Sequence, residues 1–220
     1  MVERAYAALG ALADPVRRRL YEYVAAQRDA VGREQAAEGA GVPLHSARFH
    51  LDRLVEAGLL EVERRRLSGR TGPGAGRPAK LYRRSAADIE VSVPPRRYDL
   101  VGAVLAAAVE RSLTGTELPT ALTEEARAAG REDGRVCTAS GSDLERCTSV
   151  LADRGFEPTP DDGGAHLRNC PFDALARTHT ALVCGLNHDY VVGVLEGLSC
   201  VSLAARLEPA DDRCCVRLDG

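Results

Sequence analysis

Residues 44–67 read LHSARFHLDRLVEAGLLEVERRRL, and this stretch decides the fold of the N-terminal part of the chain. Its first part predicts a helix over residues 44–57 that stops at Gly58, because apolar residues recur there at helical spacing. The apolar stripe consists of Ala47, Leu51, Leu54 and Val55. Its second part, residues 59–67, predicts a strand. A polar, arginine-bearing helix face therefore precedes a basic strand.

The residues before this stretch predict a second helix at a sharp turn. Residues 33–38 favour a helix that ends at Gly39 or Gly41, and Gly41-Val42-Pro43 forms the turn. Further upstream, Asp14 can cap a helix that starts at Pro15. Helix, turn and helix in this order place the helix at 44–57 as a recognition helix, with its apolar stripe on the domain and its polar face outward.

The residues after the stretch predict a β-hairpin with a basic tip. The segment SGRTGPGAGRPA at 68–79 is rich in turn residues and leads to a second short strand at 80–83. Arginine and lysine side chains on such a wing can reach phosphates or the minor groove. The candidate DNA contacts are His45, Ser46, Arg48, Phe49 and Arg53 on the helix, and Arg66, Arg70, Arg77 and Lys80 on the wing.

Several independent motifs in this region resemble one known superfamily. LADPVRRRLYEYV at 12–24, SARFHLDRLVEAGLLE at 46–61 and GRPAKLY at 76–82 are similar to winged-helix regulators related to the arsenic repressors. The resemblance covers roughly residues 8–84. It implies a winged helix-turn-helix that binds double-stranded DNA, with Arg48 and its helix neighbours in the major groove and His50 in a packing role.

Charge and hydropathy favour the same assignment. Residues 1–97 carry 18 Lys and Arg against 12 Asp and Glu, whereas the rest carries 11 against 20, so the net charge changes from +6 to −9. A basic first part favours nucleic acid, and the acidic second part does not. The start MVERAYAALG lacks the pattern of a secretory signal, and the apolar run at 100–109 is too short to span a bilayer. We therefore expect a cytoplasmic protein with no membrane partner.

The middle of the chain predicts a linker and a dimerisation helix. Residues 85–97 contain SVPPRR and few side chains that could pack, whereas 98–113 form a broad apolar and small-residue face. That helix can pair with its copy in a homodimer, or it can pack on its own C-terminal domain. A second helix is expected at 124–131. The predicted domains are 1–85 (DNA-binding), 86–135 (linker and dimerisation) and 136–220 (sensor).

The last part of the chain is expected to be a small α+β domain, so the whole chain falls in the α+β class. A helix at 143–154 precedes a short hairpin formed by 156–158 and 165–168, and a strand pair at 202–207 and 214–218 closes the chain. On the helix, Cys147 reads as a small core residue. Five of the seven cysteines lie in this region after residue 169, namely Cys170, Cys184, Cys200, Cys214 and Cys215.

Helix geometry limits which of these cysteines can share one centre. A single helix from Cys170 to Cys184 would hold them about 21 Å apart, so a break near His179-Thr180 is expected. With a new helix from about residue 187, both cysteines would precede helix N-termini, which favour the thiolate. Cys200 then lies at the far end of that helix. Strand alternation makes Cys214 the inward thiol and Cys215 its reserve.

This C-terminal pattern resembles a second, narrower family. NCPF at 169–172, a downstream Cys184 and CCVRL at 214–218, after a winged helix, look like the SufR-type iron–sulfur regulators. The resemblance implies a homodimeric repressor at an inverted-repeat operator, with a [4Fe–4S] cluster held by three cysteines, here Cys170, Cys184 and Cys214. For a fourth ligand, His179, His188, Asp189 and Cys215 stay open.

Three other chemistries are compatible with the same residues. Three cysteines and a histidine also suit Zn²⁺, so a zinc-responsive regulator is the main alternative. A thiol–disulfide switch would use the vicinal pair Cys214-Cys215, although neighbouring residues rarely form a relaxed disulfide. Cys170 or Cys184 with His179 could be a nucleophile and its base, but no third orienting residue is evident. The sequence thus predicts a regulator that senses redox, nitric oxide or iron–sulfur status, and no enzyme.

Overall fold

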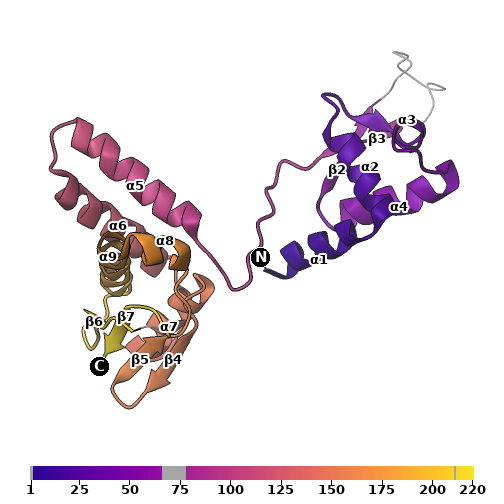
Figure 1. Cartoon of the computed structure of the whole chain (residues 1–220). Coiled ribbons are helices and arrows are strands. Elements are labelled where there is room, and N and C mark those ends of the chain that lie inside the picture. The colour runs from indigo at the N-terminus through magenta and orange to yellow at the C-terminus, as the bar shows by residue number, and fades with distance from the viewer. Residues whose placement is uncertain (1, 66–77, 211) are drawn as a thin grey trace. The chain divides into compact units, whose positions relative to one another are not determined.

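The computed structural model describes residues 2–65, 78–210 and 212–220 (Figure 1). Helices and strands are both abundant and lie in two compact units, Met1–Val91 and Ser92–Gly220. The predicted α+β class is thereby confirmed. None of the helices among the described residues combines the length and the apolar character that crossing a membrane requires.

The N-terminal unit consists of helices against a small sheet. Its elements are α1 (Val2–Ala13), α2 (Pro15–Ala25), β1 (Val31–Gly32), α3 (Arg33–Gly39), α4 (Leu44–Glu56), β2 (Leu60–Arg65) and β3 (Ala79–Arg84). The carboxylate of Asp14 caps α2 as expected, because it accepts from the Val16 and Arg17 amides at 2.8 and 3.0 Å. At the turn between α3 and α4, Gly41 adopts a left-handed φ of 61°.

The wing sheet has three strands in the order β1-β3-β2. The sequence predicted the antiparallel pair β2–β3 but missed β1, which has two residues and pairs with Leu81 and Tyr82 of β3. The helices pack on this sheet through a core of Leu20, Val24, Leu51, Leu54 and Tyr82, all 2 % exposed or less. This core fixes the position of α4 relative to the wing strands.

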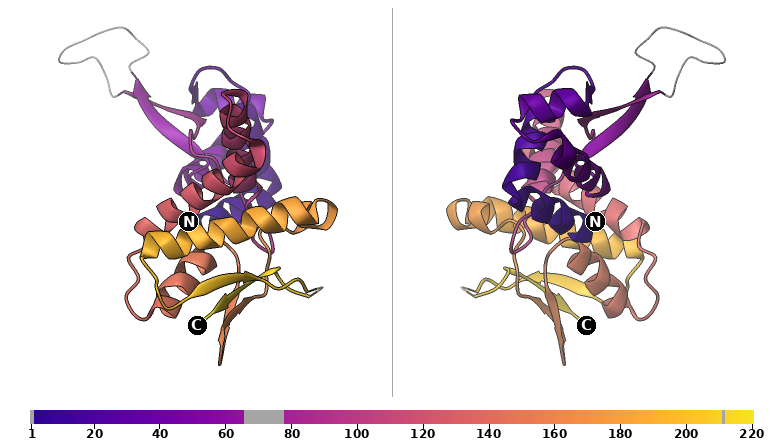
Figure 2. Two further views of the ribbon diagram at one scale, coloured as in Figure 1. Left: turned by 90° about the vertical axis from the view of Figure 1, so that its left-hand side faces the viewer. Right: turned by 90° about the vertical axis from the view of Figure 1, so that its right-hand side faces the viewer.

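The C-terminal unit contains five helices and four strands among its described residues. They are α5 (Tyr98–Leu113), α6 (Leu118–Arg135), α7 (Asp143–Asp153), β4 (Pro158–Asp161), β5 (Gly164–Leu167), α8 (Asp173–Thr178), α9 (Thr180–Leu198), β6 (Ala204–Leu207) and β7 (Val216–Asp219). The sheet order is β4-β5-β7-β6, with all pairs antiparallel. Figure 2 shows α9, in orange to yellow, running across this sheet.

Helices α6 and α9 lie side by side and run in the same direction. A Cβ on Gly130 would lie 2.0 Å from the Tyr190 carbonyl oxygen, and one on Gly134 would lie 2.9 Å from the Leu198 amide nitrogen. On the facing helix, a Cβ on Gly193 would lie 2.2 Å from the Arg127 carbonyl oxygen. The two backbones therefore approach closely at these glycines, where a side chain would force the helices apart. The sequence reading missed this pairing and predicted α6 too short.

The segment around Cys184 also folds differently from the prediction. The expected break occurs at His179 (φ −131°, ψ 47°), which separates α8 from α9. However, α9 begins at Thr180, so the prediction of a helix from residue 187 is wrong. The side chains of Val183, Leu186, Tyr190 and Val191 are all buried, and this apolar face stabilises the extra turns despite their weak helix formers.

Candidate functional site

The recognition helix α4 presents polar and aromatic side chains on the face opposite its buried stripe. Ala47, Leu51 and Leu54 are fully buried, whereas His45, Arg48 and Phe49 are exposed. Ser46 is half-buried, and Arg53 is exposed but engaged, since it pairs with Glu56 at 2.9 Å and lies 5.5 Å from the Phe49 ring centre. The predicted contacts Arg66, Arg70 and Arg77 lie outside the described residues.

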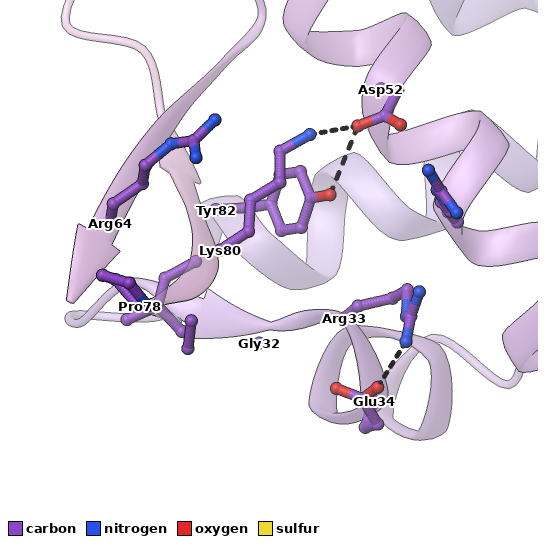
Figure 3. A pocket seen from close by; sticks show the side chains of 11 residues that line it. Gly32, Arg33, Glu34, Asp52, Arg64, Pro78, Lys80 and Tyr82 are labelled. Carbon is purple, nitrogen blue, oxygen red and sulfur yellow. Dashed lines mark hydrogen bonds and ion pairs between the residues drawn. The ribbon is translucent and has the colours of Figure 1, made fainter. Parts of the chain in front are cut away.

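A cleft of about 430 Å³ lies between α4, the start of α3 and the wing strands (Figure 3). Four cationic side chains line it, and two acidic ones partly neutralise them. The lining charges are Arg33, Arg48, Arg64, Lys80, Glu34 and Asp52. Because its walls belong to the recognition helix and to the wing, a nucleic-acid backbone that meets both elements would pass this cleft.

Lys80, a predicted DNA contact, has an ionic partner within the protein. Its Nζ atom is ion-paired with Asp52 of α4, and the hydroxyl of Tyr82 donates to the same carboxylate at 3.3 Å (Figure 3). Burial lowers the pKa of Lys80, but the contacts with Asp52 and Tyr82 outweigh it and raise that pKa. Lys80 thus joins the wing to the recognition helix, and a wing contact predicted for DNA is partly used within the protein.

Two arginines of the cleft have no such partner. Within the described parts of the chain, Arg48 and Arg64 form no ion pair, and both side chains are exposed. Arg33, by contrast, pairs with Glu34 at 2.8 Å. Arg64 belongs to the basic wing that the sequence predicts, whereas no sequence pattern indicated Arg33. Only the pairing of β1 with β3 brings Arg33 beside the wing, and a two-residue strand leaves almost no pattern to read.

Four cysteines from three places in the chain gather in the C-terminal unit. Cys170 precedes α8, Cys184 lies in the second turn of α9, and Cys214 and Cys215 precede β7. The Cys214 amide donates to the Leu167 carbonyl at 2.9 Å, which fixes the last pair beside the end of β5. All seven cysteines of the chain are free thiols.

Interactions within this group and burial shift the pKa values of three of the thiols. Interaction with Cys214 and burial raise the pKa of Cys170, and burial raises that of Cys184, which also interacts with Cys215. Interaction with Cys170 lowers the pKa of Cys214, but the contact with Cys215 and burial outweigh it, so this pKa is about 12. The prediction that Cys184 precedes a helix N-terminus is wrong, because this residue lies inside α9. Cys170 does precede α8, and a backbone hydrogen bond at Phe172 lowers its pKa, but the interaction with Cys214 and burial outweigh that contribution.

The strand-alternation argument for Cys214 over Cys215 also does not hold. Because β7 begins at Val216, the preceding two residues are not bound to alternate across the sheet. Both thiols are buried, at 2 % and 8 % exposure, and both interact with other cysteines of the group. The structure thus brings Cys215 into the same group as the three cysteines that the resemblance implies.

The other candidate ligands have different surroundings. The His188 Nε2 atom lies 3.2 Å from the Ala205 carbonyl oxygen. Asp189 accepts from Thr123 at 2.9 Å and from Arg127 at 3.1 Å. His179 is exposed at the junction of α8 and α9. His188 and Asp189 are therefore already engaged with partners other than the thiols.

The remaining three cysteines form a separate group. Cys137 follows α6, Cys200 follows α9, and Cys147 lies buried on α7, where burial raises its pKa to about 12. The Arg146 guanidinium lies 3.7 Å from the Cys200 sulfur and donates to the Leu198 carbonyl at 3.0 Å. Cys184 and Cys200 thus belong to opposite ends of α9.

Soft sulfur donors in this number suit an iron–sulfur cluster or Zn²⁺, and they do not suit Mg²⁺ or Ca²⁺. Among the described residues, no three His, Cys, Asp or Glu side chains are already spaced as the ligands of one ion. The four thiols interact pairwise and come from three elements. The donor set consequently fits a thiophilic group, and binding would have to draw the thiols together and displace their protons.

Comparison with known proteins supports the reading of the first unit. Residues 12–63 match the helix-turn-helix domain family. No curated protein and no solved structure matches the chain. The matched segment contains α2, α3 and α4, and the structure adds the hairpin β2–β3. The first unit is a winged helix-turn-helix, and the protein is a DNA-binding transcriptional regulator.

Proposed function

We propose that this regulator is a homodimeric repressor whose binding to an inverted-repeat operator depends on a [4Fe–4S] cluster held by its C-terminal cysteines. The observation that carries the proposal is the gathering of Cys170, Cys184, Cys214 and Cys215 from three separate segments. Three of these cysteines are the ligands that the resemblance to SufR-type regulators implies, and Cys215 is our candidate for the fourth. Such a regulator has no catalytic role.

Backbone contacts position each of the four cysteines. The Arg96 guanidinium donates to the Cys170 carbonyl at 3.1 Å, and the Asp173 amide donates to the same oxygen at 3.1 Å. Cys184 lies within helix α9, the Cys214 amide donates to the Leu167 carbonyl, and the Cys215 carbonyl accepts from the Glu208 amide at 2.7 Å. With these four ligands joined, α8, α9 and β7 would be cross-linked into one unit. A bound cluster supplies redox chemistry and sensitivity to oxygen, peroxide or nitric oxide.

The homodimer is supported by apolar side chains on α5. Val101, Val104 and Ala108 are buried in the C-terminal unit, so α5 packs on its own domain. Val109 and Leu113 nevertheless remain 48 % and 83 % exposed. One face of α5 therefore packs on its own domain, and the face with Val109 and Leu113 is left for packing against a second copy of the chain. A dimer presents two recognition helices to two half-sites.

The test is anaerobic purification of the full chain with a visible spectrum and iron and acid-labile sulfide analysis. We expect roughly equal iron and sulfide in the wild type and their loss in C170S, C184S, C214S and C215S. C137S and C200S are matched controls, because they remove thiols of the separate group. Operator affinity is then measured with and without the cluster, and a coupling of about 5–150-fold is expected.

Two results would contradict the proposal. A colourless protein with zinc bound by the same four cysteines would establish the zinc-responsive alternative on the same scaffold. A metal-free protein whose operator affinity changes on oxidation would indicate a thiol–disulfide switch instead. The same preparations report the oligomeric state by light scattering, and a monomer would exclude the proposed dimer.

A further inference from the structure

Asn187 is a polar side chain buried among apolar ones at the thiol group. It lies on α9, one turn after Cys184, so both side chains share a face of the helix. Its exposure is 0 %, and its Nδ2 atom donates to the Cys214 sulfur at 3.0 Å. Its Oδ1 atom is buried and has no hydrogen-bond partner among the described residues.

This arrangement is unfavourable for folding alone. A buried carbonyl oxygen without a hydrogen-bond partner destabilises the folded state, and a leucine of similar size would avoid that cost. The neighbouring positions on the helix, Val183, Leu186 and Val191, show that this face accepts apolar residues. A protonated thiol is also a weak acceptor for the amide. The contact becomes a stronger, charge-assisted hydrogen bond when the sulfur is a thiolate, as in a metal ligand.

The adjacent polar residues do not share this position. His188 contacts the Ala205 carbonyl, and Asp189 is bound by Thr123 and Arg127. Of the three consecutive polar residues 187–189, Asn187 is therefore the one whose side chain is hydrogen-bonded to a thiol. Groups that hydrogen-bond to a ligand orient it, and N–H groups directed at cluster sulfurs shift the reduction potential.

We propose that Asn187 is a positioning residue of the thiol centre, which holds the Cys214 sulfur as a ligand and makes the reduction potential of the bound cluster more positive. The inference rests on the proposed cluster. The direction follows from charge: the N–H dipole stabilises the extra negative charge that reduction adds. Without this dipole, reduction becomes less favourable and the potential becomes more negative.

The test compares wild type with N187L, N187A and D189N, each as the full chain purified anaerobically. N187L removes the donor and keeps the volume, N187A removes the donor without adding bulk or charge, and D189N alters a polar contact of the same helix away from the thiols. The readouts are iron and sulfide content and the midpoint potential from a spectroelectrochemical titration. We expect a more negative potential in N187L and N187A, and the wild-type potential in D189N.

The outcomes separate this inference from the proposed function. Wild-type protein without iron and sulfide would overturn both. A wild-type cluster with the same potential in the Asn187 variants would overturn the inference alone, as would an equal shift in D189N. If N187L does not fold, N187A carries the test, because it removes the donor without adding bulk or charge.

Discussion

Lys80 on the wing strand β3 is ion-paired with Asp52 on the recognition helix α4. The two residues are 28 positions apart, and both line the cleft together with Arg48 and Arg64. An exposed pair of this kind contributes only about 0–1 kcal/mol to stability. Its larger effect is on the DNA-facing surface, because Asp52 places a negative charge among the arginines and occupies Lys80.

Single substitutions of Asp52 and of Lys80 should therefore change the DNA affinity in opposite directions. D52N removes the negative charge and releases Lys80, so we expect tighter binding to non-specific duplex, whereas K80A should weaken binding. Thermal unfolding of both variants should stay close to that of the wild type. Fluorescence anisotropy with a labelled duplex at several salt concentrations measures the effect. Changes of the same sign in both variants would show that the pair acts by holding the wing in place.

Arg48 and Arg64 should both be needed for operator binding. We expect R48A to cost about 1–3 kcal/mol, and to relax the base preference at one position, if Arg48 reads a base edge from the recognition helix. R64A, on the wing, should weaken all duplexes alike and lower the salt slope by about one. R135A is the control, since Arg135 is an exposed arginine of the other unit. Wild-type affinity and base preference in R48A would show that Arg48 does not contact the operator.

The close contact of α6 and α9 predicts opposite effects for two glycines on one helix. G193A would force a methyl group to within 2.2 Å of the Arg127 carbonyl oxygen, so the backbones must separate. We expect a loss of about 1–3 kcal/mol or more. G185A meets nothing within 4 Å and should be neutral, or stabilising by up to about 1 kcal/mol. Urea unfolding followed by circular dichroism compares them, and equal effects would contradict the observed packing.

Asp143 should make the C-terminal unit sensitive to acid. Hydrogen bonds from Arg146 and Ser202 hold the pKa of this carboxyl well below its usual range, and its carboxylate also accepts from the Val201 amide at 3.1 Å. A depressed folded-state pKa contributes stability above the unfolded value of about 3.9, and this contribution is lost as the pH falls below it. D143N should therefore lower the Tm at pH 7 and flatten its decrease below about pH 4. An unchanged acid profile would show that the carboxylate does not stabilise the fold.

Much of the fold could be predicted from the sequence, because local signals specify it. The helices at 33–39, 44–56 and 98–113 follow from apolar periodicity, and Asp14 and Gly58 mark boundaries that depend only on near neighbours. The antiparallel pair β2–β3 follows from two short segments with strand character on either side of a glycine-rich stretch of sequence. The basic character of residues 1–97 and the clustering of cysteines after residue 169 can likewise be read from composition alone.

The tertiary structure alone decided the features that depend on distant contacts. The start of α9 at Thr180 follows from the burial of an apolar face, which outweighs weak helix formers, and β1 exists only because β3 lies beside it. The parallel contact of α6 and α9 needs glycines that meet across 60 residues. The contacts of Lys80 with Asp52 and of Asn187 with Cys214 depend on the packing of separate elements. Spacing along a chain specifies a local conformation, whereas these contacts depend on which faces are buried together.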